Sequence, residues 1–199
     1  MSENPAGPKE IQVKVVLLGD DSVGKTSLVA AYKDGSVPKG ELPVILPNFA
    51  KTEEVGDTKV QMILWDSACT SDFDEIRRKS YAQTNVFIMC FALDTPVTLT
   101  NVQTKWMQEI ENYKESALIV LVGTKMDQRQ MTEELIGSIR AKINPKIYMD
   151  VSAISNINVN ELFHLIAQGI VDPSSLPALP EVDLSKKESE AQSQCCLLL

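Results

Sequence analysis

Short runs of apolar residues recur along the chain and alternate with longer segments of mixed polarity. The first run covers residues 12–18 and is rich in valine, a pattern typical of a strand buried on both faces. Similar runs predict buried strands over residues 85–93, 117–122 and 146–151. Apolar residues at helical spacing predict helices over residues 26–33, 97–113, 131–143 and 158–171.

Two further strands are predicted over residues 49–55 and 58–65, because Gly56-Asp57 between them is a typical hairpin turn. Strands that alternate with helices predict an α/β fold with a mostly parallel central sheet and helices on both faces. The sequence contains no internal repeat.

The 199 residues suit one domain of ordinary size with a short tail. We predict a disordered lead over residues 1–9, one globular domain over residues 10–171 and a flexible tail over residues 172–199. The tail begins where a proline-rich stretch makes a continued helix impossible.

The chain carries 27 acidic and 19 basic residues, for a net charge of −8. Such an acidic protein is a poor nucleic-acid binder, because phosphate contacts need a basic surface. Its four cysteines lack metal-ligand spacing. Neither a secretory signal nor a run of about 18 apolar residues is present, so a reducing, cytosolic environment is expected.

Residues 19–26 match the pattern G-x-x-x-x-G-K-[ST] of a phosphate-binding loop, between a predicted strand and a predicted helix. The glycines let the backbone bend around phosphate, so that N–H groups and the helix N-terminus face the anion. Lysine neutralises phosphate charge and threonine coordinates Mg²⁺. The alternative is a turn that binds nothing. The predicted contacts are Gly19, Asp21, Ser22, Val23, Gly24, Lys25, Thr26 and Ser27.

Two polar loops that follow predicted strands are candidates for reading the nucleotide base. In Thr124-Lys125-Met126-Asp127, the carboxylate can accept two hydrogen bonds from the guanine edge, which adenine does not offer. The Lys125 stem can pack along the base. After the next strand, the backbone N–H groups of Ser152, Ala153 and Ile154 are candidates for the guanine carbonyl oxygen. Each loop alone is also compatible with a simple polar turn.

Asp66 ends the third predicted strand, in Leu64-Trp65-Asp66. A carboxylate at a strand end beside a phosphate-binding loop suits Mg²⁺, through a bound water. The alternative role is a helix cap or a turn. We predict that Thr26 and Asp66 lie on the metal side of the site.

The order of these motifs resembles that of Ras-type small GTPases, whose P-loop domain binds GTP or GDP with Mg²⁺. The intervening residues are similar to the Rho branch, including Leu64-Trp65-Asp66, Ser80-Tyr81, Lys105-Trp106 and Thr124. The resemblance covers about residues 12–171. It implies effector proteins and an exchange factor as partners. The helical insert that Rho proteins carry after the Asp127 position is missing here.

Three residues depart from the family pattern where hydrolysis takes place. Asp21 replaces a glycine, so it crowds the γ-phosphate and adds a like charge beside it. Cys69 replaces a second glycine and restricts the backbone. Thr70 replaces the glutamine that orients the attacking water, and it is too short to do so. No intact catalytic residue is therefore predicted, and hydrolysis is expected to be slow or absent.

Two further departures affect the first switch of the resemblance. Val44 stands at the position of the threonine that binds Mg²⁺ and the γ-phosphate, and valine cannot coordinate a metal. Val37 replaces an aromatic residue that packs on the guanine, and its loss is expected to speed nucleotide release by about tenfold or less.

The sequence Cys196-Leu197-Leu198-Leu199 matches a prenylation box, and the final leucine favours a geranylgeranyl group. One lipid binds a membrane only marginally, so Cys195 is the candidate second site, by palmitoylation or prenylation. We expect the protein at the cytoplasmic face of a membrane, the plasma membrane first, with a cytosolic pool.

Two functions fit these observations. The first is a monomeric, membrane-anchored Rho-like GTPase in signal transduction, which the resemblance connects with actin and cell shape. The second is a scaffold that neither hydrolyses nor switches and that recruits partners at a membrane. The substitutions at Asp21, Val44, Cys69 and Thr70 favour the second, whereas the intact phosphate and base motifs favour nucleotide binding.

Overall fold

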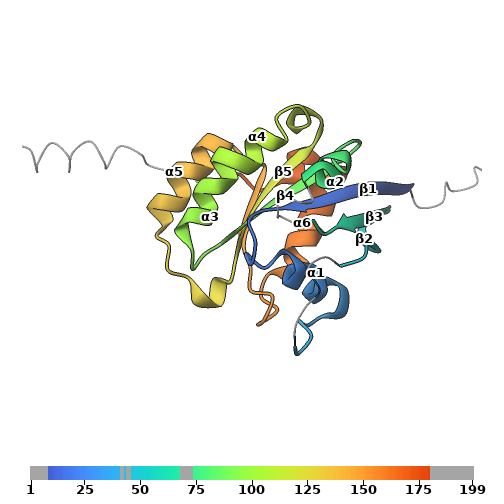
Figure 1. Cartoon of the computed structure of the whole chain (residues 1–199). Helices are drawn as coiled ribbons and strands as arrows, with labels where there is room; N and C mark the ends of the chain where they lie inside the picture. Colours follow the sequence, from blue (N-terminus) through green and yellow to red (C-terminus); the bar gives the residue numbers. More distant parts are fainter. Residues whose placement is uncertain (1–8, 41–42, 44–45, 68–73, 180–199) are drawn as a thin grey trace, which may run out of the picture.

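The computed structural model describes residues 9–40, 43, 46–67 and 74–179. A six-stranded sheet of order β2-β3-β1-β4-β5-β6 forms the centre of this part of the chain (Figure 1). Only β2 runs antiparallel to its neighbour, which confirms the predicted mostly parallel α/β fold. The strands are β1 Lys9–Leu18, β2 Phe49–Val55, β3 Thr58–Trp65, β4 Val86–Ala92, β5 Leu118–Thr124 and β6 Ile147–Asp150.

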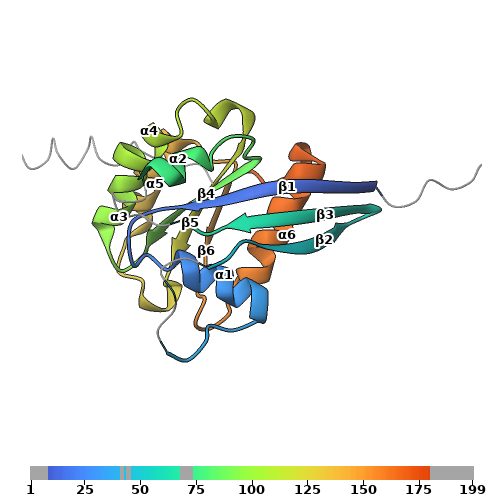
Figure 2. The same ribbon diagram turned by 45° about the vertical axis from the view of Figure 1, so that its right-hand side comes forward.

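Helices cover both faces of the sheet (Figure 2). One apolar core packs α1 (Lys25–Asp34) and α6 (Val159–Val171) against the first face. A second core packs α3 (Pro96–Asn101) and α5 (Glu133–Ile143) against the other face. Successive β1 residues enter the two cores in turn, Val15 and Leu17 the first, Val16 and Leu18 the second. This explains the unbroken apolar run that predicted a strand buried on both faces.

The long helix predicted over residues 97–113 is wrong in detail. It is divided into α3, a π-helical turn η2 (Val102–Trp106) and α4 (Met107–Glu109). A π-turn fits an extra residue into one helical turn, and such turns occur at functional sites more often than elsewhere. The chain then continues in turns to η3 (Lys114–Ser116). Apolar spacing could not reveal this, because the extra residue shifts the periodicity only slightly.

Other boundaries differ by a few residues, and one helix was not predicted. β1 begins at Lys9, inside the expected lead, because it pairs with β3 from that residue onward. The unpredicted helix is α2 (Asp74–Lys79), in which Arg77 is the one buried residue. A six-residue helix with a single buried, charged side chain has no apolar periodicity to detect.

The segment after α6 also departs from the prediction, which placed a flexible tail from residue 172. A short 3-10 turn, η5 (Pro173–Ser175), follows α6, and the Asp172 side chain accepts a hydrogen bond from Ser174 N–H. Leu176 then packs against the first core, next to Gly169 on α6, where the absence of a side chain leaves room for it. The chain is therefore ordered at least through this contact. Residues 180–199 lie outside the described part.

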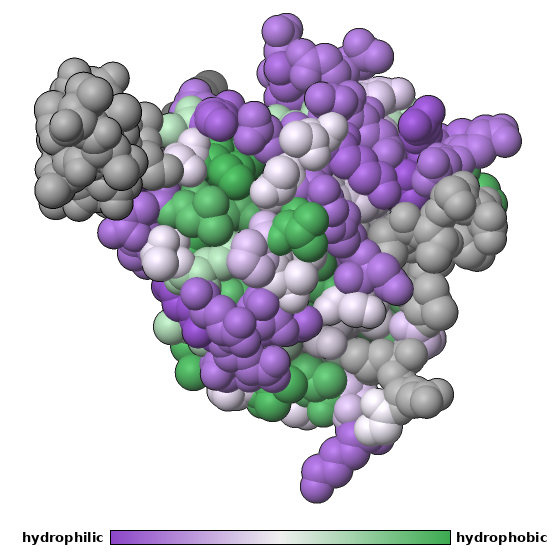
Figure 3. All heavy atoms as spheres, turned by 60° about the vertical axis from the view of Figure 1, so that its left-hand side comes forward, coloured by the Kyte–Doolittle hydropathy of each residue, from purple (hydrophilic) through white to green (hydrophobic). Residues whose placement is uncertain are grey.

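On the face shown in Figure 3, hydrophilic side chains cover much of the surface and apolar side chains gather in patches between them. Among the described residues, no helix combines the length and apolar character that crossing a bilayer requires.

Candidate nucleotide-binding site

A cavity of about 450 Å³ opens at the carboxyl ends of the parallel strands. This edge is where ligands bind in open α/β sheets. The loops that follow β1, β3, β5 and β6 all contribute to its wall. Its lining residues are Asp21, Ser22, Gly24, Lys25, Thr26, Ser27, Leu28, Pro43, Ser67, Thr124, Lys125, Asp127, Gln128, Val151, Ala153 and Ile154. The structure therefore brings together the predicted phosphate, base and metal segments.

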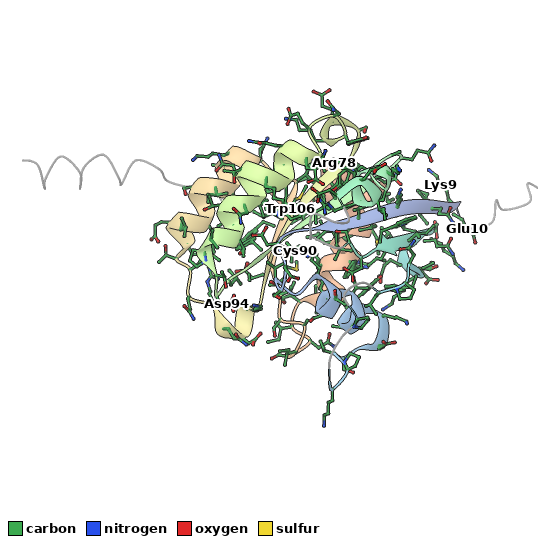
Figure 4. All side chains as sticks on the ribbon, in the orientation of Figure 1. Lys9, Glu10, Arg78, Cys90, Asp94 and Trp106 are labelled. Carbon is green, nitrogen blue, oxygen red and sulfur yellow. The ribbon has the colours of Figure 1, made fainter. Side chains whose placement is uncertain are left out.

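The two glycines of the phosphate-binding loop have backbone conformations that other residues rarely adopt. Gly19 has φ +149°, and a Cβ on it would lie 2.3 Å from the carbonyl oxygen of Cys90 on β4. Figure 4 shows Cys90 beside the start of this loop. Gly24 has φ +96° and precedes the first residue of α1. Glycine is thus required at both positions, for close approach at the first and for backbone conformation at both.

The side chain of Lys25 folds back over the loop. Its ammonium group donates to the carbonyl oxygens of Gly19 (3.0 Å) and Asp20 (2.7 Å), and the residue is 6% exposed. A cation in this position gives the cavity positive charge where phosphate is predicted to lie. The side chain of Val23 is buried in the core and does not line the cavity, so a contact of Val23 with phosphate through its backbone N–H stays a prediction.

Asp66 and Thr26 meet on the predicted metal side. The Thr26 hydroxyl donates to Asp66 Oδ2 (2.9 Å), which also accepts the backbone N–H of Leu46 (3.0 Å). The other oxygen, Oδ1, is buried and has no hydrogen-bond partner. Burial raises the pKa of Asp66, although its hydrogen bonds and the charge of Lys25 act in the opposite direction. A buried, unpartnered carboxylate oxygen beside a hydroxyl fits a hard divalent cation such as Mg²⁺.

Replacing Asp66 by asparagine tests this assignment. The amide oxygen of the new side chain can accept both existing hydrogen bonds, so we expect the Mg²⁺-free variant to be at least as stable as the wild type. In the wild type, the buried Oδ1 without a hydrogen-bond partner costs about 1–3 kcal/mol. With GDP present, Mg²⁺ should raise the melting temperature of the wild type by about 2–4 °C for each kcal/mol that its binding adds to the free energy of unfolding. The melting temperature of the variant should not respond to Mg²⁺. Asp57→Asn, in the exposed hairpin turn, is the control. An equal response to Mg²⁺ in Asp66→Asn would exclude Asp66 from the metal site.

The base side of the cavity is organised around Ser152, which is fully buried. Its hydroxyl donates to Asp127 Oδ1 (2.5 Å) and accepts from the Ser155 N–H (3.1 Å). This bond orients the carboxylate that is predicted to read guanine. The prediction for the Ser152 amide is wrong, because its N–H already donates to the Ile157 carbonyl (3.1 Å). Ala153 and Ile154 line the cavity, and their contact with the guanine carbonyl oxygen stays a prediction.

Thr124 and Lys125 connect the base loop to its surroundings. The Thr124 hydroxyl contacts the carbonyl oxygens of Val23, in the phosphate-binding loop, and of Phe91 (2.9 Å). Lys125 has φ +55° and forms a salt bridge with Asp94 (3.1 Å). Its stem is thereby held along the cavity wall. No role at the site was predicted for Asp94, although it follows the buried strand β4 and lies at the same end of the sheet (Figure 4).

Several residues of interest lie elsewhere. Val37 packs against the first apolar core and does not line the cavity, so this side chain provides no cover over a base. Asp21 does line the cavity, next to Ser22, which has φ +58°. Outside the described residues lie Val44, Cys69, Thr70, Cys195 and Cys196.

A model of the Ras family matches residues 14–172 of the chain. The Ras-like GTP-binding protein RHO1 of Entamoeba histolytica is 30% identical over 194 residues, which cover 93% of this chain and 90% of that protein. The chain belongs to the Rho branch of the Ras family. The GTP-binding protein rho5 of Schizosaccharomyces pombe is 32% identical, over 84% of this chain and 93% of that protein. The GTP-binding protein RHO1 of Candida albicans is 29% identical, over 97% and 98%.

Membership of the Rho branch explains why the phosphate, metal and base motifs occur in this order along the chain. The base loop continues after Asp127 through the short turn η4 (Met126–Gln128) and reaches α5 at Glu133. Arg129 connects this short stretch to Asp150 (2.8 Å) and Glu133 (2.5 Å). Ion pairs thus hold the short stretch between the base loop and α5.

Proposed function

We propose that this Rho-type protein binds GTP and GDP with Mg²⁺ in the cavity beside α1, and that its intrinsic hydrolysis is slow. The observation that carries the proposal is the convergence of Lys25, Thr26, Asp66 and Asp127 on one cavity wall or directly beside it. When bound, Mg²⁺ would neutralise phosphate charge. Thr26 and Asp66 are the residues placed to hold it, the latter through a water.

Phosphate binding rests on the loop between β1 and α1. Its backbone and the start of α1 face the cavity, and Lys25 can exchange its carbonyl partners at Gly19 and Asp20 for phosphate oxygens. Both exchanges keep the ammonium hydrogen-bonded, so the cost of releasing the carbonyls is partly offset.

Guanine selectivity rests on Asp127, and Asp127→Asn tests it. The amide removes an acceptor for the 2-amino group, so we expect guanine affinity to fall at least about 100-fold. Xanthine carries an oxygen at that position and should bind the variant better than guanine does. Competition of GDP, XDP and ADP against a fluorescent GDP measures this, with Asp57→Asn as the control. An unchanged preference for guanine in Asp127→Asn would contradict the assignment.

Slow hydrolysis is supported by Asp21. Its side chain replaces the family glycine and lines the cavity on the side of the phosphate-binding loop. A carboxylate there repels the triphosphate and occupies space that the attacking water needs. Cys69 and Thr70 support the same conclusion from the sequence alone.

A second candidate is a scaffold that binds nucleotide but does not switch. The observation that favours it is the Leu46 N–H donated to Asp66, together with the packing of the Leu46 side chain against the first core. These contacts hold the chain near the first switch without a metal-binding threonine. Equal amide exchange around Leu46 in the GDP and GTP states would support the scaffold.

We also propose attachment to the cytoplasmic face of the plasma membrane through lipid on Cys196, with Cys195 as the second site. The Cys-Cys-Leu-Leu-Leu sequence supports this. Action on actin and cell shape is proposed from the family alone. Mass spectrometry of the protein expressed in eukaryotic cells tests the lipid, and an unmodified Cys196 would contradict it.

A further inference from the structure

We propose that Trp106 is a positioning residue that couples the phosphate-binding loop to α2, through its indole N–H on Asp20 and its ring face on Arg77. This inference rests on the proposed nucleotide binding. It adds a path by which occupancy of the cavity reaches the helix that follows Asp66.

The first step is the carboxylate of Asp20, whose two oxygens both contact the helical segment on the far side of the loop. Oδ1 accepts the indole N–H of Trp106 (2.8 Å), and Oδ2 accepts the side-chain amide of Asn101 (2.6 Å). The carbonyl of the same residue accepts the Lys25 ammonium (2.7 Å). Asp20 is therefore held from inside the loop by Lys25 and from outside by α3 and η2.

The second step is the position of the indole. Trp106 is fully buried at the end of the π-turn, in the second core. Figure 4 shows it among the α3, α4 and α2 ribbons. The guanidinium carbon of Arg77 lies 5.1 Å from its ring centroid. The one polar atom of the Trp106 side chain is the indole nitrogen, and its N–H donates to Asp20. The ring therefore cannot shift without breaking that hydrogen bond or the contact with Arg77.

The third step is the attachment of α2. The Arg77 side chain is 1% exposed and forms two hydrogen bonds with Glu109, of 2.9 and 3.0 Å, and one with Asp74, of 2.7 Å. It is the one buried residue of α2, whereas Ile76 is 65% exposed. The position of this short helix therefore depends on Arg77, whose guanidinium also lies over the ring of Trp106.

These contacts give cavity occupancy a route to α2. A phosphate that attracts the Lys25 ammonium withdraws it from the Asp20 carbonyl, so the backbone at Asp20 is released on one side. The side chain of Asp20 then transmits any movement of the loop to the indole, and the indole to Arg77. Coupling of this kind requires a chain of packed contacts between two elements, and each link here is a direct contact between named atoms.

Three variants test the coupling. Trp106→Phe removes the N–H but keeps an aromatic ring. D20N removes the negative charge that accepts the N–H groups of Asn101 and Trp106, and the double variant D20N/N101D restores a charged pair with its polarity reversed. Phe163→Leu, in the opposite core, controls for general loss of stability. Amide exchange of residues 74–79 is measured in nucleotide-free protein, and release of fluorescent GDP in loaded protein.

We expect Trp106→Phe and D20N each to speed amide exchange in α2 several-fold more than Phe163→Leu does. Each should also speed GDP release about tenfold, because each weakens a hydrogen bond to a charged group. The double variant should reverse both effects. Unchanged α2 exchange in Trp106→Phe, or no recovery in the double variant, would overturn the coupling. If the wild type fails to bind fluorescent GDP, the proposed function fails, while exchange in nucleotide-free protein still decides whether the loop and α2 are coupled.

Discussion

Replacing Gly19 by alanine is expected to lower the free energy of unfolding by about 2–5 kcal/mol and to weaken nucleotide binding at least about 100-fold. The new Cβ would lie 2.3 Å from the Cys90 carbonyl oxygen, which belongs to the sheet and cannot move away cheaply. The backbone must therefore change, and with it the direction of the N–H groups that face phosphate. Chemical denaturation and titration with fluorescent GDP measure the two effects.

Gly35→Ala is the matched control for this substitution. Gly35 ends α1 with φ +74°, and a Cβ there would meet nothing within 4 Å. Only the backbone strain of an alanine at positive φ remains, so a loss of about 1–2 kcal/mol and normal nucleotide affinity are expected. Equal effects of the two substitutions would mean that the contact with Cys90 does not determine the loop.

Replacing Glu109 by glutamine is expected to cost about 3 kcal/mol at neutral pH. Glu109 is 6% exposed in its side chain and accepts hydrogen bonds from Arg77 and from the Tyr81 hydroxyl. The substitution removes the buried charge of Glu109 from beside the guanidinium of Arg77, and the pair of Arg77 with the partly exposed Asp74 remains. Glu75→Gln, on α2, is the control, because its pair with Lys79 is exposed and should contribute less than about 1 kcal/mol.

The same variant predicts a pH dependence. Burial alone would raise the pKa of Glu109, but the bonds from Arg77 and Tyr81 outweigh it, so the folded-state pKa is lowered. A lowered pKa stabilises the fold above the unfolded value of about 4.3, and this stabilisation is lost as pH falls through the folded value. The stability gap between wild type and Glu109→Gln should therefore be constant near pH 7 and close below about pH 4. A gap independent of pH would show that Glu109 contributes by packing alone.

Local signals were enough to predict the elements whose causes are local. The hairpin of β2 and β3 was predicted with its bounds, because Gly56-Asp57 marks the turn. The strand β1 was predicted from its valines, but its first residues were missed because pairing with β3 extends it. α2 and the π-turn depend on Arg77 and Trp106, whose buried polar contacts come from distant parts of the chain.

The candidate site was predictable for a similar reason. Parallel strands bring their carboxyl ends together, so motifs after successive strands had to meet at one edge. What the sequence could not show is which backbone groups are already used. The Ser152 N–H donates to the Ile157 carbonyl, and the Leu46 N–H donates to Asp66 Oδ2, through turns that no spacing rule describes. Asp20 was passed over because its partners are 81 and 86 residues away.

The proposal of slow hydrolysis with retained nucleotide binding is tested most directly by single-turnover conversion of bound GTP. The purified wild type and the variant D21G/C69G/T70Q, which restores the family residues, are loaded with GTP, and the nucleotide is separated at intervals after Mg²⁺ is added. We expect the wild type to keep its GTP and to convert it at least about tenfold more slowly than the restored variant. Equal conversion by the two proteins, with GDP already in the wild-type pocket at purification, would contradict the account.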